Sequence, residues 1–389
     1  MWWNILRWAV LGGALIPLFY YVFAIRCARR YFLEARAATP PAGFTPPISI
    51  LKPIRGLDPQ AYENFASFCR QDYPEHEILF CAGDANDPAV PVIQQLIRDF
   101  PGRSIRLLIG AEEIGASGKV NNLCRMAREA RHEFLLISDS DIRVEPDFLR
   151  RAVAPLRDSI VGATTCIYLG IVEPQLGAEL EALGAVGDFW AGVLVSRCVE
   201  GVKFAFGAAI LTSRERLAEI GGFEALADCF VDDYELGRRI AARGHRIELA
   251  PCAVWTMYPP QSLADFLAHQ MRWLLAVRHA RPGGHLGLLF TQGLPWALAA
   301  ALLAPTGAVA IGYLASYLVL RLAMAWTVGV WGLRDDLVRR RWWLLPLRDA
   351  IWFLVWLASF FRNRIRWRGA IYKLRAGRLI PLEPRIRRG

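Results

Sequence analysis

The sequence predicts an α/β domain built on a mostly parallel β-sheet, joined to transmembrane or interfacial helices at both ends of the chain. Short apolar runs alternate with stretches of helical period from Ile48 to about Cys252, a pattern typical of βαβ units. Apolar segments about as long as a bilayer is thick lie on either side of that region. The hydrophobic fraction of 54% and the mean hydropathy of +0.26 fit a water-soluble domain attached to a few membrane segments.

The N-terminal region predicts a membrane anchor over residues 1–30 and a linker over 31–47. Residues 8–25 are apolar and are followed by the basic cluster "RCARR", which favours the cytoplasmic side for the chain that follows. Because the stretch lacks a small-residue cleavage site, an anchor is favoured over a removed signal peptide. The Pro-rich "TPPAGFTPP" marks the linker.

Residues 48–261 are expected to form a water-soluble α/β domain on the cytoplasmic side of the membrane. Stretches of helical period such as "PQAYENFASFCRQ" and "PAVPVIQQLIRDF" separate most of its strand candidates. Ligands of parallel α/β sheets bind at the carboxyl ends of the strands, and Asp84 and Asp139 both follow strands. The strand candidates are "ISILKP", "EILFCAG", "SIRLLIG", "EFLLIS", "GATTCIYL", "FAFGAAIL" and "RIELAP".

The C-terminal third predicts further membrane association. Residues 262–283 have the pattern of an amphipathic interfacial helix, and 284–331 read as two transmembrane helices separated at "APTG". A shorter apolar run over 350–361 has basic residues on both sides, which conflicts with a simple crossing. Residues 332–389 are therefore expected to form an interfacial or re-entrant segment and a basic cytoplasmic tail.

The net charge of +10 favours an anionic partner. Lipid headgroups explain it more simply than nucleic acid, because the charge lies mostly beside the membrane segments and no soluble patch carries stacking aromatics. We therefore expect the bilayer as a partner and no nucleic acid. The eight cysteines occur singly and the six histidines lack metal-ligand spacing, which favours reduced thiols over a zinc or disulfide framework.

The stretch "LLISDSDIRV" places Asp139 and Asp141 directly after a buried strand. Two carboxylates at a sheet edge are suitable ligands for Mg²⁺ or Mn²⁺, which in turn can hold a diphosphate. The alternative is a solvated turn that caps the next helix, and for this motif alone the turn is favoured.

Other polar groups add to the metal and donor hypothesis. Lys119 and Asn121, in "ASGKVNNL", open a helix and suit polar contacts to a nucleotide. Asp232 and Asp233 begin another helix, where acids are favourable in any case. A carboxylate beside a like charge nevertheless tends to have a raised pKa, which suits a general base.

The predicted helix in "SLADFLAHQMRWLLAVRHAR" brings a third group of polar and aromatic side chains together. His269 lies three and four residues before Arg272 and Trp273, so these three share one face of the helix. A helix lying on the membrane surface is the simpler explanation of the same pattern.

Together these motifs resemble a known family. Asp84, Asp139, Asp233 and "HQMRW" follow the order of the D, D, D, (Q/R)xxRW set of membrane-bound GT-A glycosyltransferases. More specifically, "ILKPIRGLDP", "FCRQDYPEHEILFCAGDANDPA", "GKVNNL", "SDSDIRVEPD", "VDDYELGRRIAARGHR" and "WRGAIYKLRAG" resemble the ceramide glucosyltransferase family, which includes bacterial hopanoid-biosynthesis glycosyltransferases. The resemblance runs from about Ile48 to Arg378. His269 departs from it, because the family has Gln or Arg at that position.

The resemblance implies a role for each matched residue. Asp84 would contact the uridine of a UDP-sugar, and Asp139 would bind the diphosphate through Mg²⁺ or Mn²⁺ with Asp141 as a helper. Asp233 would be the base that deprotonates the acceptor hydroxyl, with inversion at the sugar. In the last motif, Arg272 would neutralise the leaving UDP and Trp273 would line the acceptor or sugar site. The roles of Asp232 and His269 stay open.

The expected function is transfer of one sugar, glucose or N-acetylglucosamine, from a UDP-sugar to a membrane lipid, either ceramide or a hopanoid such as bacteriohopanetetrol. The expected location is the inner membrane of a bacterium, with several spans and the catalytic domain in the cytoplasm. A processive polysaccharide synthase is the rival within the enzyme class, and a non-catalytic lipid-binding or transport protein is the rival outside it. The sequence predicts no oligomeric state.

Overall fold

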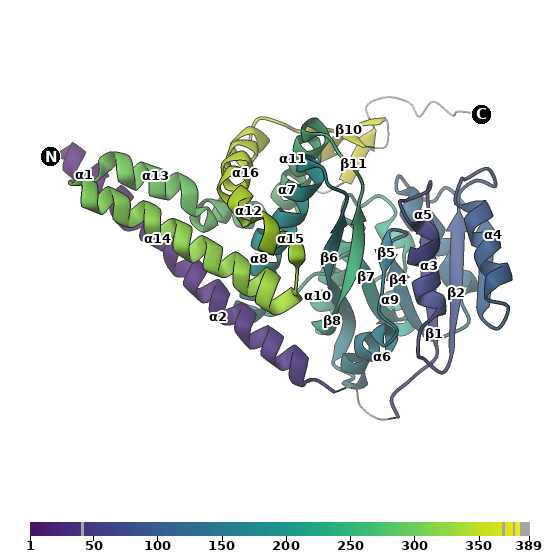
Figure 1. Cartoon of the computed structure of the whole chain (residues 1–389). Helices are drawn as coiled ribbons and strands as arrows, with labels where there is room; N and C mark the ends of the chain where they lie inside the picture. Colours follow the sequence, from purple (N-terminus) through teal and green to yellow (C-terminus); the bar gives the residue numbers. More distant parts are fainter. Residues whose placement is uncertain (40–42, 368–369, 376–377, 382–389) are drawn as a thin grey trace. The chain divides into compact units, whose positions relative to one another are not determined.

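The computed structural model of the chain describes residues 1–39, 43–367, 370–375 and 378–381 (Figure 1). It divides into two compact units. The sheet unit comprises Glu34–Ile171 and Glu200–Pro259. The helical unit comprises Met1–Leu33, Val172–Val199 and the chain from Pro260 onward.

An eight-stranded sheet in the order β3-β2-β1-β4-β7-β6-β8-β5 forms the centre of the sheet unit. β1 pairs in parallel with β2 and β4, and β2 with β3, whereas β7 runs antiparallel to β4 and β6. The sheet is therefore mixed, and the predicted parallel pairing describes one half of it. The strands are β1 Ile48–Ile54, β2 His76–Ala82, β3 Ser104–Ile109, β4 Phe134–Ser138, β5 Ile142–Arg143, β6 Val161–Val172, β7 Ala209–Ser213 and β8 Arg246–Tyr258.

Each of the seven strand candidates contains or overlaps a strand, with one shift that matters. The candidate "FAFGAAIL" begins at Phe204, but β7 begins only at Ala209. The residues before it form a loop at the edge of the sheet. The short strand β5 was not predicted, because two residues carry no alternating pattern.

Helices pack on this sheet through apolar faces. In α4, Val90, Ile93 and Leu96 are buried and follow the helical repeat. The rings of Phe65 and Phe80, from α3 and β2, meet edge to face with their centroids 5.0 Å apart. The helices of this unit are α3 Ala61–Cys69, α4 Val90–Asp99, α5 Gly118–Glu129, α6 Phe148–Val153, α9 Arg214–Glu219 and α10 Asp232–Ala242.

The helical unit is built mainly from α-helices, with two π-helical stretches and a small antiparallel sheet near the end of the chain. Its helices are α1 Trp2–Gly13, α2 Leu15–Ala37, α7 Leu176–Gly184, η2 Ala185–Phe189 (π), α8 Trp190–Val199, α11 Leu263–Ala280, α12 Pro282–Gly287, α13 Gly293–Leu303, α14 Gly307–Ala325, η5 Trp326–Leu333 (π), α15 Asp336–Arg341 and α16 Leu345–Ser359. The strands of the small sheet are β9 Arg364–Trp367, β10 Ala370–Arg375 and β11 Arg378–Pro381.

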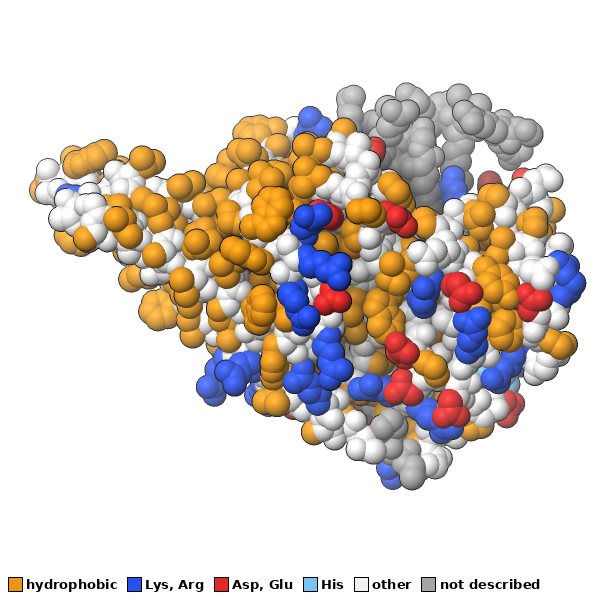
Figure 2. All heavy atoms as spheres, viewed as in Figure 1, with side chains coloured by type: hydrophobic (Ala, Val, Ile, Leu, Met, Phe, Trp, Pro, Cys, Tyr) orange, Lys and Arg blue, Asp and Glu red, His pale blue; other side chains and the backbone are white. Residues whose placement is uncertain are grey.

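Among the described residues, three helical segments are long and apolar enough to cross a membrane: Trp2–Ala37, Leu176–Val199 and Gly307–Leu333. A fourth is possible if Pro282–Thr291 and Gly293–Leu303, bent by 51° at their junction, form one broken span. Large apolar side chains such as Trp8, Phe19, Leu302 and Ile311 are exposed, and hydrophobic atoms cover this part of the surface in Figure 2. Exposed apolar surface of this extent is typical of membrane contact.

The second of these segments, Leu176–Val199, was not predicted. The expected catalytic domain ran without interruption over 48–261, but the chain leaves the sheet unit after β6 and returns at Glu200. The sequence pattern hides the segment because Gly and Ala make up much of it and three acids interrupt it. The structure shows that these acids, Glu179, Glu181 and Asp188, are paired with basic or polar side chains of the same unit.

Buried charges connect this inserted segment to the C-terminal helices. Arg321 on α14 makes a bidentate contact with Asp349 on α16, with both N–O distances at 2.8 Å. The same guanidinium lies 3.0 Å from Asp188 on η2, and Arg348 pairs with Asp188 as well. Charges in an apolar environment are tolerated when they are paired, and these pairs hold η2 against α14 and α16.

The predicted interfacial run over 350–361 lies largely within α16, which is not among the candidate spans. The three short strands β9, β10 and β11 follow it. Residues 368–369, 376–377 and 382–389 of the predicted basic tail lie outside the described residues.

Candidate active site

The carboxyl end of β4 brings several predicted site residues together. β4 ends at Ser138, so Asp139 lies at the edge of the sheet. Lys119, from the first turn of α5, places Nζ 2.6 Å from Oδ1 of Asp139 and 3.7 Å from Oδ2 of Asp232. Lys119 therefore bridges the acid after β4 and the acids at the start of α10.

Asp233 faces the same space and is held by two backbone donors. Its Oδ2 accepts a hydrogen bond from Gly207 N at 2.7 Å, and its Oδ1 accepts one from Tyr234 N at 2.8 Å. Burial and the charge of Asp232 together raise the pKa of Asp233 to about 6, against the opposing charge of Lys119. A carboxyl group with this pKa can accept a proton near neutral pH.

Gly207 marks the point at which these side chains converge. A Cβ atom added there would lie 3.1 Å from Asp233 Oδ2, 3.2 Å from Asp139 Oδ2 and 3.4 Å from Lys119 Nζ. The absence of a side chain at Gly207 thus leaves the space between the two acids open. The residue was not singled out from the sequence, because it was placed inside a strand.

Opposing charges act on Lys119. Burial would lower its pKa, but the charges of Asp139 and Asp232 outweigh burial and hold the pKa above its ordinary value. The ammonium group is therefore a permanent positive charge at this edge of the sheet.

Asp141 is held apart from this bridge. Its carboxylate accepts a hydrogen bond from Thr256 Oγ1 of β8 at 2.6 Å. Burial and the charge of Asp139 together raise the pKa of Asp141 to about 6, against the opposing hydrogen bond from Thr256.

Lys52 supports the motif from inside the sheet. Its Nζ donates to the backbone oxygen of Asp139 at 2.9 Å and lies 3.8 Å from the centre of the Phe68 ring. Burial lowers the pKa of Lys52 to about 7, although the charges of Asp141 and Asp139 raise it. No role was predicted for Lys52, although it lies within the motif "ILKPIRGLDP", because the sequence of an apolar strand does not show what its one lysine will contact.

Asn121 and Asn122 support loops beside the site. Asn121 accepts from Gly115 N at 3.1 Å and donates to Gly115 O at 3.2 Å, so both of its polar atoms are used by the loop backbone. Asn122 donates to the backbone oxygens of Ile54 and Cys81 and thereby joins β1 to β2. Asn121 was predicted to contact the nucleotide-sugar donor. Its hydrogen bonds in the structure shape the loop before α5.

Asp84 lies in an exposed turn after β2. Its Oδ1 accepts from Asn86 N at 2.8 Å, which is the local turn geometry typical of Asp. Because β2 pairs in parallel with β1, and β1 with β4, the turn with Asp84 and the segment with Asp139 follow strands that end at one edge of the sheet.

A glycine in α10 fixes how closely that helix approaches the loop containing Gly207. A Cβ on Gly237 would lie 2.3 Å from Ala205 N and 2.5 Å from the carbonyl carbon of Phe204, and the neighbouring Leu236 and the next-turn Ile240 are buried. We expect Gly237→Ala to lower the free energy of unfolding by about 1–3 kcal/mol, because overpacking outweighs the gain in helix propensity. The loss is measured as a reduced Tm of the full chain in detergent.

The matched control for that variant is Gly118→Ala, at the start of α5, where a Cβ would meet nothing within 4 Å. It should leave the Tm unchanged. An unchanged Tm for Gly237→Ala would mean that α10 can move away from residues 204–205 without cost.

The last predicted motif lies on α11 in the helical unit. Nδ1 of His269 contacts Oε1 of Glu181 on α7. The Trp273 ring meets the Phe189 ring edge to face at 4.7 Å. Burial lowers the pKa of Arg272, against the charge of Glu181, and no hydrogen bond from its guanidinium is found within the described part of the chain. On the predicted shared face of α11, His269 therefore contacts α7 and Trp273 contacts η2.

The donor set at the sheet edge fits a divalent ion that arrives with a ligand. In the described ranges no group of three or more His, Cys, Asp or Glu side chains could hold a metal. Mg²⁺ commonly uses one or two carboxylates together with substrate phosphates and water. Asp139 supplies such a carboxylate, whereas the protein alone builds no complete cage.

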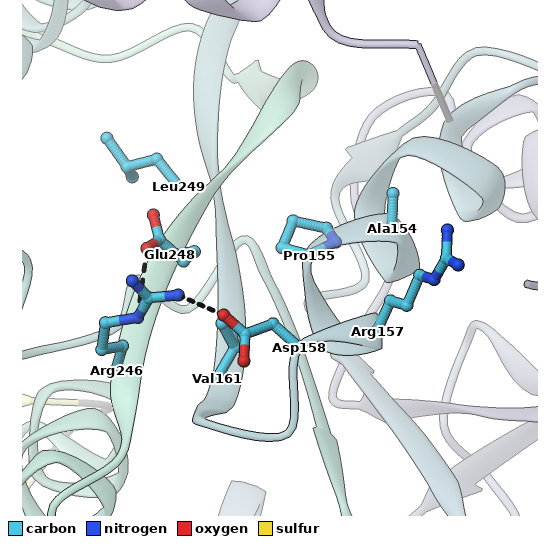
Figure 3. A pocket seen from close by; sticks show the side chains of 8 residues that line it. All are labelled: Ala154, Pro155, Arg157, Asp158, Val161, Arg246, Glu248 and Leu249. Atoms are coloured by element: carbon cyan, nitrogen blue, oxygen red, sulfur yellow. Dashed lines mark hydrogen bonds and ion pairs between the residues drawn. The ribbon is translucent and has the colours of Figure 1, made fainter. Parts of the chain in front are cut away.

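A shallow surface hollow occurs elsewhere in the sheet unit (Figure 3). It lies where β6 and β8 begin, and Arg246 crosses it to contact Asp158 and Glu248. Because β6 runs parallel to β4 through their common partner β7, this hollow lies at the opposite end of the strands from Asp139. None of the predicted site residues lines it.

The mixed sheet belongs to the GT-A glycosyltransferase fold, as comparison with a solved structure shows. The mannosyltransferase PcManGT from Pyrobaculum calidifontis, solved in complex with GDP-Man and Mn²⁺, superposes with a TM-score of 0.52 at 19% identity. The match covers 90% of this chain and 99% of that protein. It confirms the predicted fold class.

The model of the family "Glycosyl transferase family 21" matches residues 9–380, so the chain belongs to that family. Ceramide glucosyltransferase 3 of Caenorhabditis elegans is 28% identical over 230 residues, which is 59% of this chain and 50% of that protein. The ceramide glucosyltransferase of Gibberella zeae is 35% identical over 173 residues, which is 41% of this chain and 32% of that protein. The chain thus spans half or less of the length of these relatives. The sequence predicted the ceramide glucosyltransferase family and a hexosyltransferase. The family match and these relatives confirm both predictions.

Proposed function

We propose that the protein transfers one sugar, glucose or N-acetylglucosamine, from a UDP-sugar to a hydroxyl group of a membrane lipid, with inversion at the sugar. The observation that supports this most strongly is the convergence of Asp139, Lys119 and Asp233 around Gly207. One side of this space carries groups suited to a diphosphate, and the other carries a carboxylate suited to a base.

In the proposed reaction Asp233 acts as the base. Its carboxylate takes the proton from the acceptor hydroxyl, and the oxygen attacks the anomeric carbon from the face opposite the diphosphate. The bond from that carbon to the diphosphate oxygen breaks, and its electron pair leaves with UDP. The raised pKa of Asp233 suits this step, since a stronger base takes the proton more readily while remaining ionised near neutral pH.

Asp139 would hold Mg²⁺ or Mn²⁺ together with the donor diphosphate, with Asp141 as a second carboxylate nearby. When bound, the ion neutralises charge that develops on the leaving diphosphate. Lys119 supplies a fixed positive charge beside Asp139 and supports the same task. The loop shaped by Asn121 and the turn of Asp84 would contact the nucleotide, with Asp84 at the uridine.

The motif on α11 would serve the leaving group and the acceptor. Arg272 carries a positive charge without a hydrogen-bond partner in the described residues and would neutralise the departing UDP. Trp273, packed on Phe189, would line the acceptor or sugar site. These two roles come from the family resemblance. A guanidinium of Arg272 that makes no hydrogen bond in the described residues is compatible with them.

The proposed acceptor is a lipid alcohol, either ceramide or a hopanoid polyol. Three or four candidate membrane spans make this a membrane protein by composition, so the acceptor would enter from the bilayer and the charged donor from water. We propose the bacterial inner membrane as its location, with the sheet unit in the cytoplasm, because the basic cluster after the first span favours that orientation.

The decisive test is a product assay. Purified full-length protein in vesicles would receive Mg²⁺, UDP-glucose and UDP-N-acetylglucosamine, and either ceramide or bacteriohopanetetrol. We expect a single lipid product heavier by one hexose or one N-acetylhexosamine, detected by mass spectrometry. A ladder of products would identify a processive synthase instead. Intact donors with every acceptor would favour a lipid-binding protein without transferase activity.

A further inference from the structure

The buried acid Glu181 requires partners, and it has two on separate oxygens. Its side chain is 8% exposed on α7, and an ionised carboxylate in such a position must be paired or hydrogen-bonded. Oε1 contacts Nδ1 of His269, and Oε2 accepts from Nε2 of Gln261. Glu181 therefore connects α7 to the beginning and the middle of the α11 region.

This contact favours one arrangement of the His269 ring. An ionised carboxylate can only accept a hydrogen bond, so its contact with Nδ1 favours a hydrogen on that nitrogen. The other ring nitrogen, Nε2, has no hydrogen bond within the described part of the chain, and the side chain is 30% exposed. A carboxylate that holds one imidazole nitrogen and leaves the other available is the arrangement by which proteins set a tautomer and aim a ring.

The surroundings of Nε2 combine polar and apolar groups. One turn further along α11 lie Arg272 and Trp273, and Trp273 packs against Phe189 of η2. Phe189 belongs to the candidate membrane segment Leu176–Val199. A ligand that meets this surface would have a hydroxyl group for Nε2 and an apolar body for the aromatic rings, which is the chemistry of a lipid alcohol.

We propose that His269 receives the hydroxyl-bearing headgroup of the lipid acceptor through Nε2, and that Glu181 is a positioning residue that acts through His269. This inference rests on the proposed function. It also gives a physical reason for the departure from the family pattern: an imidazole held by a carboxylate replaces the Gln or Arg expected at the first position of the motif.

Glu179 provides a matched control on the same helix. It lies two residues before Glu181, its side chain is 11% exposed, and its Oε1 pairs with Nε of Arg341 at 3.0 Å. Within the described residues Glu179 makes no ion pair with His269, yet its loss also leaves a basic side chain of the same unit without its carboxylate. A purely structural role for Glu181 would make the two acids equivalent in their effect on acceptor use.

The test is a double-mutant cycle on the full-length protein in vesicles, with UDP-glucose and ceramide or bacteriohopanetetrol as probes. Glu181→Leu should raise KM for the lipid about tenfold or more, as loss of a group that orients a ligand does, and leave KM for UDP-glucose unchanged. Glu181→Gln should retain much of the activity, because its amide oxygen still accepts from Nδ1 and the Gln261 amide can turn over. Glu179→Leu should leave KM for the lipid unchanged.

The cycle then asks whether Glu181 acts through His269. The double variant Glu181→Leu/His269→Leu should be no worse than His269→Leu alone, because the second change removes the group that the first one positions. Additive losses, or equal losses for Glu179→Leu and Glu181→Leu, would overturn the proposal while the proposed transferase function stands.

A second measurement does not depend on activity. The ¹⁵N spectrum of protein labelled at histidine, with the His269 signals identified by their loss in His269→Leu, should show hydrogen on Nδ1 in the wild type and in Glu181→Gln. Glu181→Leu should shift it toward the Nε2 form. Wild-type protein with Nε2 protonated and Nδ1 bare would overturn the inference even if no glycolipid is formed in the assay.

Discussion

Asp233→Asn is expected to reduce turnover by about 10²–10⁴-fold, the contribution typical of a positioned general base. The substitution keeps the size of the side chain but removes its ability to take the acceptor proton. Binding of the UDP-sugar should persist, since the pair formed by Lys119 and Asp139, whose atoms lie 2.6 Å apart, does not include Asp233. The two effects are separated by measuring kcat and, independently, the Kd for UDP by calorimetry.

Asp232→Asn is the matched control for this variant. Asp232 is adjacent, contacts Lys119 at 3.7 Å and raises the pKa of Asp233 through its charge. Its loss should bring the pKa of Asp233 closer to the ordinary value and cost far less turnover. If Asp233→Asn worked nearly normally while Asp232→Asn did not, the role of the base would pass to Asp232.

Asp139→Asn is expected to weaken binding of the UDP-sugar roughly tenfold to a hundredfold in the presence of Mg²⁺. Hydrogen bonds to charged groups contribute about 1.5–3 kcal/mol each, which corresponds to that range. The substitution removes one carboxylate that has two functions: it would bind the ion, and it is the ion-pair partner of Lys119. The Kd for UDP, measured with Mg²⁺ and again with EDTA, should differ strongly for the wild type and little for the variant.

Asp141→Asn is the control, because Asp141 is already engaged by Thr256 and should contribute less to the ion. Full activity of the wild-type protein in excess EDTA would remove the divalent ion from the reaction and leave Lys119 as the main positive charge beside the diphosphate.

Much of the fold could be predicted because hydrophobic periodicity is a local signal. The strand candidates and the helices over 59–71 and 88–100 are present, and the acids of two motifs do follow strands. Pairing direction is not local, however. β7 returns antiparallel to β4 after the excursion through α7, η2 and α8, and no short stretch of sequence carries that information.

The candidate site was predictable where its residues form motifs and unpredictable where they act alone. Asp139, Lys119 and Asp233 come from three separate motifs, and the structure brings them to one point. Gly207 and Lys52 contribute through the lack of a side chain and through burial beneath Asp139, respectively. Such contributions depend on three-dimensional neighbours and leave no pattern in the sequence.

The insertion of Val172–Val199 between β6 and β7 has a consequence for how the protein is made. During synthesis the ribosome completes the six strands β1 to β6 before the apolar segment emerges, and β7 and β8 follow it. The strand β7, which lies between β4 and β6 in the sheet, is synthesised only after this candidate membrane segment. Assembly of the sheet is therefore coupled in time to insertion of the apolar segment. A fragment limited to the sheet unit would need a short linker between Ile171 and Glu200 in place of that segment.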